Sequence, residues 1–277
     1  MGSYLAYGKV WIIKAPVRKD KDMAKTINEI KTELKAATID TLPFFVKEYT
    51  PDQRSGVQAL VKKALQMQEK HKQELLRLEA MKAYEQQYKD CSYICGIDEA
   101  GRGPLAGPVV AGAVILPKDV EILYLNDSKK LSAAKREELY QEIKEKAIAA
   151  EVGIVEPERI DEINILQATY EAMRNAIKKL PVTPDILLND AVTIPEITVP
   201  QVPIIKGDAK SVSIAAASIM AKVTRDRIME AYDKEYPQYG FAAHKGYGAE
   251  AHYAALDQYG ICPIHRRSFL KKYMQNK

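Results

Sequence analysis

Four carboxylic acids stand at the ends of apolar segments that are far apart in the chain, namely Asp98, Glu99, Asp190 and Asp208. Sheets of α/β proteins place their ligand sites at such strand ends. Two like charges about 4 Å apart repel by roughly 4 kcal/mol at an effective dielectric constant of about 20, so a shared pocket needs raised pKa values or bound cations. Because oxygen is the only donor near these positions, the set favours Mg²⁺ or Mn²⁺ over Zn²⁺.

Each acid taken alone has a simpler interpretation. A single Asp at a strand end is most often a turn former or a helix cap. Asp208 precedes a helical segment that it could cap, and Asp190 could be a turn residue. For Asp98 and Glu99 a functional role is favoured over a structural one, because a glycine-rich loop follows this acidic pair directly.

That loop, Gly101-Arg102-Gly103, could bind an anionic or sugar ligand. Its glycines let backbone N–H groups approach a sugar or a phosphate, and the guanidinium of Arg102 can pair with an anionic oxygen. A lone Gly-Arg-Gly is usually just a turn, and lysines are usually solvated. The loop and the lysines are considered as ligand-binding groups only because they stand near the acids in the sequence. The lysines placed to contact a phosphate are Lys129, Lys206 and Lys210.

The elements that must position these residues follow from the pattern after residue 90, where short apolar strands alternate with amphipathic helices. Two early strands joined by a Gly/Pro-rich turn, followed by alternating helices and strands, predict a mixed sheet with helices on both faces, an α/β fold. A charged, partly helical tail ends the chain. The expected strands are 93–97, 109–116, 151–155, 186–188 and 202–205, and the expected helices are 133–150, 157–180 and 212–231.

The segment before residue 90 is mostly helical in pattern and rich in Lys, Glu and Gln. Ile27, Ile30 and Leu34 recur at helical spacing. After a break that ends near 43–45, Pro51 is expected at the first position of a long helix running towards residue 88. The first 20 residues form either a short strand or a disordered lead.

Composition limits the function classes only broadly. The formal net charge of +4 and the pI of about 8.7 suit a nucleic-acid or phosphate partner without requiring one. The three cysteines, Cys91, Cys95 and Cys262, form neither a redox nor a zinc pattern, and they indicate a reducing compartment. No apolar run approaches the roughly 18 residues of a membrane span. We expect a cytoplasmic protein without a membrane anchor.

The combination of motifs resembles the bacterial ribonuclease HII family over residues 93–270. The run from Gly96 to Pro108 is similar to the opening signature of that family, and Arg102 distinguishes it from the related ribonuclease HIII family, which usually has Gly-Lys-Gly here. Asn189 is a departure, since an apolar residue is more usual before the third acid. The further blocks in family order are 127–131, 206–211, 215–226, 244–248 and 265–269.

The resemblance implies a ribonuclease H-like fold with a C-terminal helical part and a metal-dependent endoribonuclease. Asp98, Glu99 and Asp190 would be the principal ligands of Mn²⁺ or Mg²⁺, with Asp208 completing the site. The Gly101-Arg102-Gly103 loop would inspect the ribose 2′-hydroxyl, and Tyr247 would pack on the sugar at the RNA–DNA junction.

The activity implied is two-metal-ion hydrolysis of the RNA strand of RNA–DNA hybrids, with cutting 5′ of ribonucleotides embedded in duplex DNA. The products would carry 5′-phosphate and 3′-hydroxyl ends, and the enzyme would act as a monomer. Two rival classes remain: a non-catalytic nucleic-acid-binding module, and a phosphotransferase, for which the loop lacks the G-x-x-x-x-G-K-[ST] spacing.

Domain organisation follows from the change in composition near residue 90. We expect an N-terminal helical extension, 1–90, and a catalytic domain, 91–277, that includes the C-terminal helices. The basic and aromatic side chains of the extension either lengthen the substrate-binding surface or belong to a solubility or partner-docking appendage. The sequence leaves both alternatives open.

Overall fold

The computed structural model describes residues 25–275. The strand and the disordered lead considered for the first 20 residues lie outside the described residues. The chain divides into two compact units, with the boundary between His71 and Lys72. That boundary falls inside the long helix α3 (Ser55–Met81), so part of the segment before residue 90 belongs to the second unit.

The first unit contains α1 (Ile27–Ala36), α2 (Leu42–Tyr49) and the beginning of α3. Thr26 and Glu29 form a capping box that starts α1, and the helix expected from Ile30 and Leu34 is confirmed. Ile30, Leu34 and Leu42 are buried together with the first turns of α3, so this unit has an apolar core of its own.

The predicted helix start at Pro51 is wrong. Leu42, Phe45 and Tyr49 lie on one buried face of α2, which occupies the segment expected to be a break, and Pro43 stands in its first turn. Asp52 accepts hydrogen bonds from the backbone N–H of Arg54 at 3.0 Å and from its guanidinium. This turn at Asp52 delays the start of α3 to Ser55.

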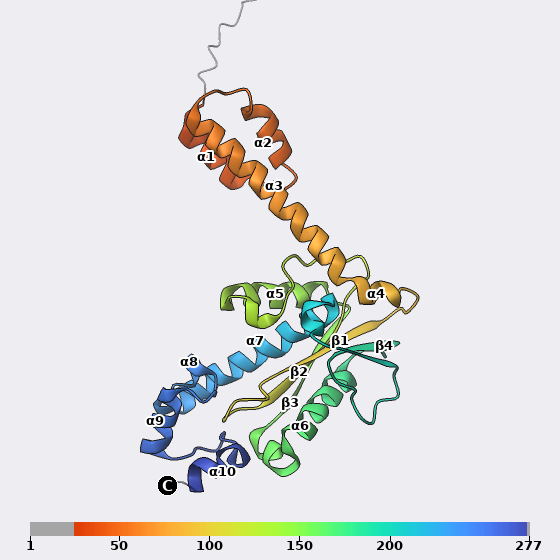
Figure 1. Cartoon of the computed structure of the whole chain (residues 1–277), viewed down its shortest axis with the longest axis vertical. Helices are drawn as coiled ribbons and strands as arrows, with labels where there is room; N and C mark the ends of the chain where they lie inside the picture. The colour runs from red at the N-terminus through yellow and green to blue at the C-terminus, as the bar shows by residue number, and fades with distance from the viewer. Residues whose placement is uncertain (1–24, 276–277) are drawn as a thin grey trace, which may run out of the picture. The chain divides into compact units, whose positions relative to one another are not determined.

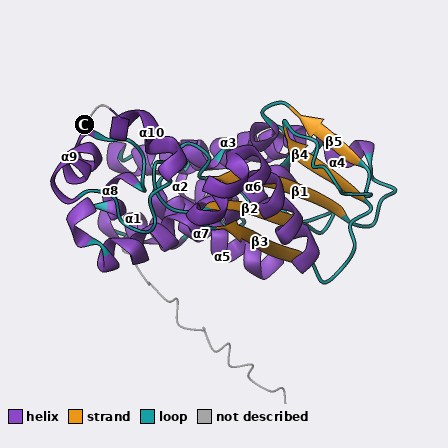
Figure 2. Cartoon of the chain, turned by 90° about the horizontal axis from the view of Figure 1, so that it is seen from below, coloured by secondary structure: helices purple, strands orange, loops and turns teal. Residues whose placement is uncertain are grey.

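The second unit is built on a five-stranded sheet of β1 (Ile94–Ala100), β2 (Val109–Ile115), β3 (Ala149–Val155), β4 (Ile186–Asp190) and β5 (Gln201–Ile204). The strand order is β3-β2-β1-β4-β5 (Figure 2). The first three strands pair antiparallel, whereas β1–β4 and β4–β5 pair parallel. The predicted mixed α/β sheet is therefore confirmed.

Helices cover both faces of this sheet (Figure 1). On one face, α7 (Val212–Glu235) and α5 (Ala133–Lys146) pack against Val114, and on the other α6 (Pro157–Lys179) packs against Ala113 and Ile115. A Cβ on Gly112 would lie 2.3 Å from the Ala217 carbonyl oxygen. Glycine therefore lets α7 run close over β1 and β2, which brings this helix beside the end of β1.

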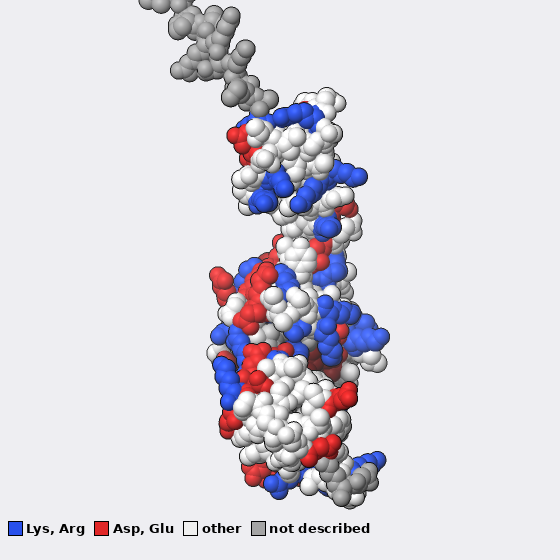
Figure 3. Space-filling model, turned by 90° about the vertical axis from the view of Figure 1, so that its left-hand side faces the viewer, with Lys and Arg blue, Asp and Glu red and all other residues white. Residues whose placement is uncertain are grey.

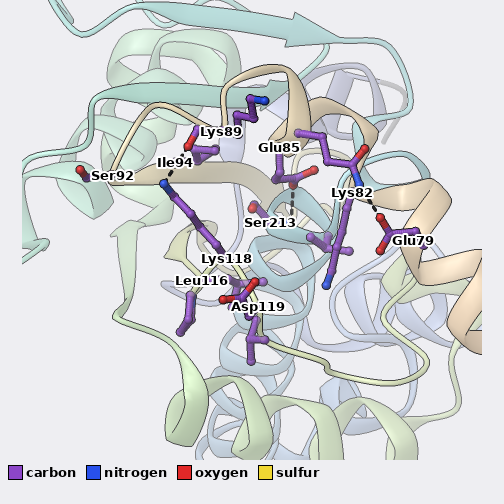
Figure 4. A pocket seen from close by; sticks show the side chains of 14 residues that line it. Glu79, Lys82, Glu85, Lys89, Ser92, Ile94, Leu116, Lys118, Asp119 and Ser213 are labelled. Atoms are coloured by element: carbon purple, nitrogen blue, oxygen red, sulfur yellow. Dashed lines mark hydrogen bonds between the residues drawn. The ribbon is translucent and has the colours of Figure 1, made fainter.

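The end of α3 and the short helix α4 (Ala83–Gln87) are built into the second unit. Leu78 and Met81 are buried in the core shared with α5 and α7. One carboxylate oxygen of Glu85 caps α7, accepting from the Ser211 hydroxyl at 2.6 Å and the Ser213 N–H at 3.0 Å. Figure 4 shows Glu85 and Ser213 in the wall of a cavity of about 330 Å³ at this junction.

The chain ends in three further helices, α8 (Phe241–His244), α9 (Glu250–Tyr259) and α10 (Arg267–Gln275), which agrees with the expected helical tail. Within residues 25–275, none of the helices combines the length and apolar character that crossing a membrane requires. Basic and acidic side chains are interspersed on the face that Figure 3 displays, as the net charge of only +4 leads one to expect.

Candidate active site

Three of the four predicted carboxylates come together at one edge of the sheet. Asp98 and Asp190 lie near the ends of the adjacent parallel strands β1 and β4, one step beyond the paired residues Ile97 and Asn189. Asp208 stands in a single 3₁₀ turn (Gly207–Ala209) after β5. Oxygen atoms of these three acids all lie within 4.8 Å of one another.

A backbone hydrogen bond brings the Asp208 turn to this edge. The N–H of Gly207 donates to Oδ1 of Asp190 at 2.7 Å, so the two acidic segments are tied directly. A Cβ on Gly207 would lie 2.5 Å from the Ile214 side chain and 3.4 Å from the same Asp190 oxygen. Glycine at this position is therefore needed for the close approach.

Glu99 lies beside the group of three without belonging to it. Its Oε1 faces Arg102 Nη1 at 3.4 Å, an ion pair whose acidic partner is nearly buried. Its Oε2 is buried and accepts no hydrogen bond from the described residues. A buried carboxylate oxygen without a donor is costly, and a bound cation would relieve that cost.

Burial and mutual repulsion perturb the acids. Burial raises the pKa of Asp98 well above its usual value, and the charges of Glu99 and Asp190 raise it further. The pKa of Asp208 is raised by burial and then by Asp127 and Asp190, against the opposing effect of Lys129. Hard oxygen donors that repel one another fit a divalent cation such as Mg²⁺ or Mn²⁺.

Two further groups at the site were missed in the sequence. The Asp127 carboxyl raises the pKa of Asp208, and it also caps the short 3₁₀ helix Ser128–Lys130 by accepting from the Lys129 N–H at 2.9 Å. The hydroxyl of Ser218 on α7 lowers the pKa of Asp98, and it lies 3.0 Å from the Ser128 hydroxyl. The Asp-Ser-Lys-Lys block was the available signal, but only its lysines were weighed.

A cavity of about 370 Å³ adjoins the acids. Gly101-Arg102-Gly103, Lys129 and Tyr247 all line it, as does Glu99, so this part of the predicted substrate site is gathered in one place. Lys206 and Lys210 are exposed and do not line it. The assignment of these two lysines to the substrate site therefore stays a prediction.

Asn189, the departure from the family pattern, is fully buried beside Asp190. Its amide nitrogen donates to the Val192 carbonyl at 3.1 Å and to the Gln201 side chain at 2.8 Å. The same glutamine exchanges two hydrogen bonds with the backbone of Ile194. The polar residue therefore ties the loop after β4 to β5 while Asp190 stays in the acidic group.

The backbone carbonyl of Tyr247 is hydrogen-bonded to a pair of linked histidines. The Tyr247 carbonyl faces Nδ1 of His252 at 2.9 Å, and Nε2 of His252 faces Nε2 of His265 at 3.0 Å. Nδ1 of His265 accepts from the Cys262 N–H. Because a carbonyl can only accept, His252 carries its proton on Nδ1 and His265 on Nε2, so both rings are neutral in this arrangement.

The two hydrogen-bonded histidines make the stability of the folded protein depend on pH. Burial and then His252 lower the pKa of His265 to about 4. The unfolded chain takes up a proton near pH 6.5 and the folded protein only near pH 4, so stability is lost as the pH falls between these values. At about 1.4 kcal/mol per pKa unit, the loss is about 3 kcal/mol. Urea unfolding at several pH values should show His265→Gln with a flatter profile than the wild type; equal slopes would contradict the assignment.

Solved structures share this architecture. The ribonuclease H2 of Pyrococcus horikoshii superposes with a TM-score of 0.55 at 29% identity, covering 66% of this chain and 98% of that one. The ribonuclease HII of Archaeoglobus fulgidus, solved in a complex with PCNA, gives a TM-score of 0.53 at 31% identity, covering 63% of this chain and 93% of that one. The fold is therefore the ribonuclease H fold.

Sequence comparisons assign the family. The family model for ribonuclease HII matches residues 95–272, and the model for the ribonuclease HII N-terminal domain matches residues 26–89. The chain is 62% identical over 229 residues to the ribonuclease HII of Lachnoclostridium phytofermentans, covering 82% of this chain and 90% of that protein. It is 52% identical over 252 residues to that of Clostridioides difficile, covering 90% and 99%. The chain belongs to the ribonuclease HII family, and it is a ribonuclease H enzyme as the resemblance indicated.

Proposed function

We propose that this enzyme hydrolyses the RNA strand of RNA–DNA hybrids and cuts 5′ of ribonucleotides embedded in duplex DNA, leaving 5′-phosphate and 3′-hydroxyl ends. The observation that carries the proposal is the group of Asp98, Asp190 and Asp208, with oxygens within 4.8 Å of one another beside a cavity that Arg102 and Tyr247 line. Acids without cations would repel a phosphate, so this site is unsuited to simple binding.

The metal-binding part of the proposal assigns Asp98, Glu99 and Asp190 as principal ligands of Mn²⁺ or Mg²⁺, with Asp208 completing the site. Two bound cations would activate the attacking water and stabilise the departing 3′ oxygen. The unpartnered Oε2 of Glu99 supports its inclusion, because it has no other donor among the described residues. Ser218, whose hydroxyl lowers the pKa of Asp98, would help to orient that carboxylate.

The recognition part assigns the sugar to the Gly101-Arg102-Gly103 loop and to Tyr247. Backbone N–H groups and the guanidinium would test for the 2′-hydroxyl, and the half-exposed ring of Tyr247 would pack on the sugar at the junction. Lys129, in the cavity wall, would neutralise the nearest phosphate. The exposed Lys206 and Lys210 would contact phosphates further along the duplex.

The test uses three duplexes of one sequence: all-DNA, DNA with a single ribonucleotide, and an RNA–DNA hybrid. We expect Mg²⁺- or Mn²⁺-dependent cutting of the last two, one cut 5′ of the ribonucleotide in the second, and only a far lower residual rate on the first. Binding without cutting under every metal condition would favour the non-catalytic module and sink the proposal.

Arg102→Ala is expected to reduce the preference for the ribonucleotide-containing duplex by roughly tenfold, because one charge-assisted contact is lost. The measurement is the ratio of kcat/KM on that duplex to the residual rate on all-DNA duplex. Arg159→Ala serves as the control, since this exposed arginine pairs with Glu162 on α6. An unchanged ratio in Arg102→Ala would remove its guanidinium from recognition.

For the domains, we keep the proposal that residues 1–90 form an extension that lengthens the nucleic-acid-binding surface and that 91–277 carry catalysis. Leu78, Met81 and Glu85 support the core of the second unit, so a truncation should remove only residues 1–71. A KM for hybrid raised several-fold would support the surface role, and an unchanged KM would favour a solubility or docking appendage.

We also propose that the enzyme is a monomer and acts in the cytoplasm. The three free cysteines fit that reducing compartment.

A further inference from the structure

Two arginines are buried directly behind the Gly101-Arg102-Gly103 loop. Arg225 of α7 is 1% exposed and Arg266, just before α10, is 0% exposed. Neither guanidinium forms an ion pair within residues 25–275, although an isolated buried charge is expensive. Burial lowers the pKa of Arg225 to about 10 and that of Arg266 to about 9, so both stay charged at neutral pH.

Backbone carbonyls take the place of counterions. Arg266 donates to Gly101 at 2.6 Å, to Arg102 at 3.0 Å and to Gly107 at 2.9 Å. Its own backbone N–H also donates to the Leu105 carbonyl at 2.8 Å. One side chain therefore gathers three carbonyls of a single loop, which only a forked cation with donors in several directions can do.

Arg225 joins the same loop to the segment that carries Tyr247. It donates to Ala106 at 3.0 Å, to Pro108 at 2.9 Å and to Lys245 at 2.9 Å. A backbone hydrogen bond from Leu105 to Gly246, at 2.8 Å, runs parallel to this link. The two walls of the cavity are thus held at a fixed separation by buried groups.

The direction of these carbonyls has a consequence for the N–H groups. In a trans peptide the C=O and the following N–H point to opposite sides, and the described chain has no cis peptide. Because the carbonyls of Gly101 and Arg102 point at Arg266, the N–H groups of Arg102 and Gly103 point away from it. Arg102 and Gly103 line the cavity, so that is the side to which their backbone donors can be presented.

We propose that Arg266 and Arg225 are positioning residues for ribose discrimination: Arg266 aims the N–H groups of Arg102 and Gly103, and Arg225 fixes the loop against the Tyr247 segment. The proposal rests on the sugar-reading role given above to that loop. Both side chains would act through the loop: Arg266 does not line the cavity, and Arg225 lines it but is only 1% exposed.

The test compares Arg266→Ala with Arg267→Ala, the exposed arginine next in the chain. Arg266→Ala should lower kcat/KM on the single-ribonucleotide duplex by about 100-fold, as small misplacements do, and reduce its preference over all-DNA duplex. Guanidinium chloride at tens of millimolar should restore roughly tenfold of this activity in Arg266→Ala but not in Arg102→Ala, because the cation can refill the buried site. Urea at the same concentration lacks the charge and should not.

A second readout does not depend on cleavage. Amide hydrogen exchange should rise in peptides covering 99–108 in Arg266→Ala, and in both 99–108 and 244–248 in Arg225→Ala, while the peptides of β3 stay protected. Arg266→Lys provides a variant that keeps the charge but cannot reach three carbonyls. It should remain folded with the same loosened loop and reduced preference.

The outcomes separate the two proposals. Unchanged exchange at 99–108 in the Arg266 variants, or a loosened loop with wild-type preference, overturns the positioning role. A wild-type enzyme that does not distinguish the ribonucleotide duplex overturns the proposed function, even where the exchange data still show the arginines holding the loop.

Discussion

Asp98→Asn is expected to abolish cleavage, by at least about a thousandfold, and at the same time to stabilise the metal-free protein. Asp98 is 5% exposed, and burial together with Glu99 and Asp190 raises its pKa. When the pKa of a carboxyl group is higher in the folded protein than in the unfolded chain, the folded protein loses stability as the pH rises above the unfolded value, here near 3.8. Replacing it with a neutral amide at pH 7 should therefore raise the free energy of unfolding.

The measurement pairs a nicking assay with urea unfolding in the presence of a chelator. Mg²⁺ should raise the melting temperature of the wild type and leave that of Asp98→Asn nearly unchanged, because the variant has lost a ligand. Asp119→Asn is the matched control, since Asp119 is exposed in the loop between β2 and α5 and should alter neither activity nor stability. A variant that cuts normally, or that is less stable without metal, would contradict the assignment of Asp98.

Gly101→Ala is the second large effect expected. Gly101 has a φ of 96°, and a Cβ there would lie 2.1 Å from Nε of Arg225 and 2.7 Å from the Pro108 carbonyl oxygen. The substitution adds a left-handed backbone penalty of roughly 1–2 kcal/mol to a clash with a side chain that three hydrogen bonds hold in place. We expect a loss of activity of about 100-fold and a lower melting temperature.

The matched control for Gly101→Ala is Gly260→Ala. Gly260 also has a positive φ, 74°, but a Cβ there meets nothing within 4 Å. This variant isolates the backbone penalty, so it should lose only part of the stability that Gly101→Ala loses and none of the activity. Equal destabilisation by the two variants would mean that the contact with Arg225 contributes little.

The strands and the acids were predictable because both produce a recognisable local sequence pattern. Short apolar runs gave β1 to β5 within a few residues, and Asp98 and Asp190 follow from standing at the ends of two such runs. Pairing of β1 with β4 was not predictable from the pattern, since it depends on a crossover connection. Asp208 was grouped with these two acids for the same reason, because it follows the apolar run 202–205, and the resemblance to the family supported that grouping.

Other residues of the site have no recognisable local sequence pattern. Arginines are usually solvated, so nothing in the residue type distinguishes the buried Arg225 and Arg266 from the exposed Arg267; only the carbonyls that converge on them do. Asp127 was hidden for the same reason, because it resembles an ordinary turn residue until the fold brings it to Asp208. Pro51 was misleading because a proline also fits the turn between two helices.

Metal binding by the three acids is tested most directly by a crystal structure grown with Mn²⁺ and recorded at a wavelength where manganese scatters anomalously. We expect an anomalous peak between the carboxylates of Asp98, Asp190 and Asp208, within coordination distance of all three. Clear density for the three side chains with no peak between them, at a Mn²⁺ concentration that supports cleavage, would contradict it.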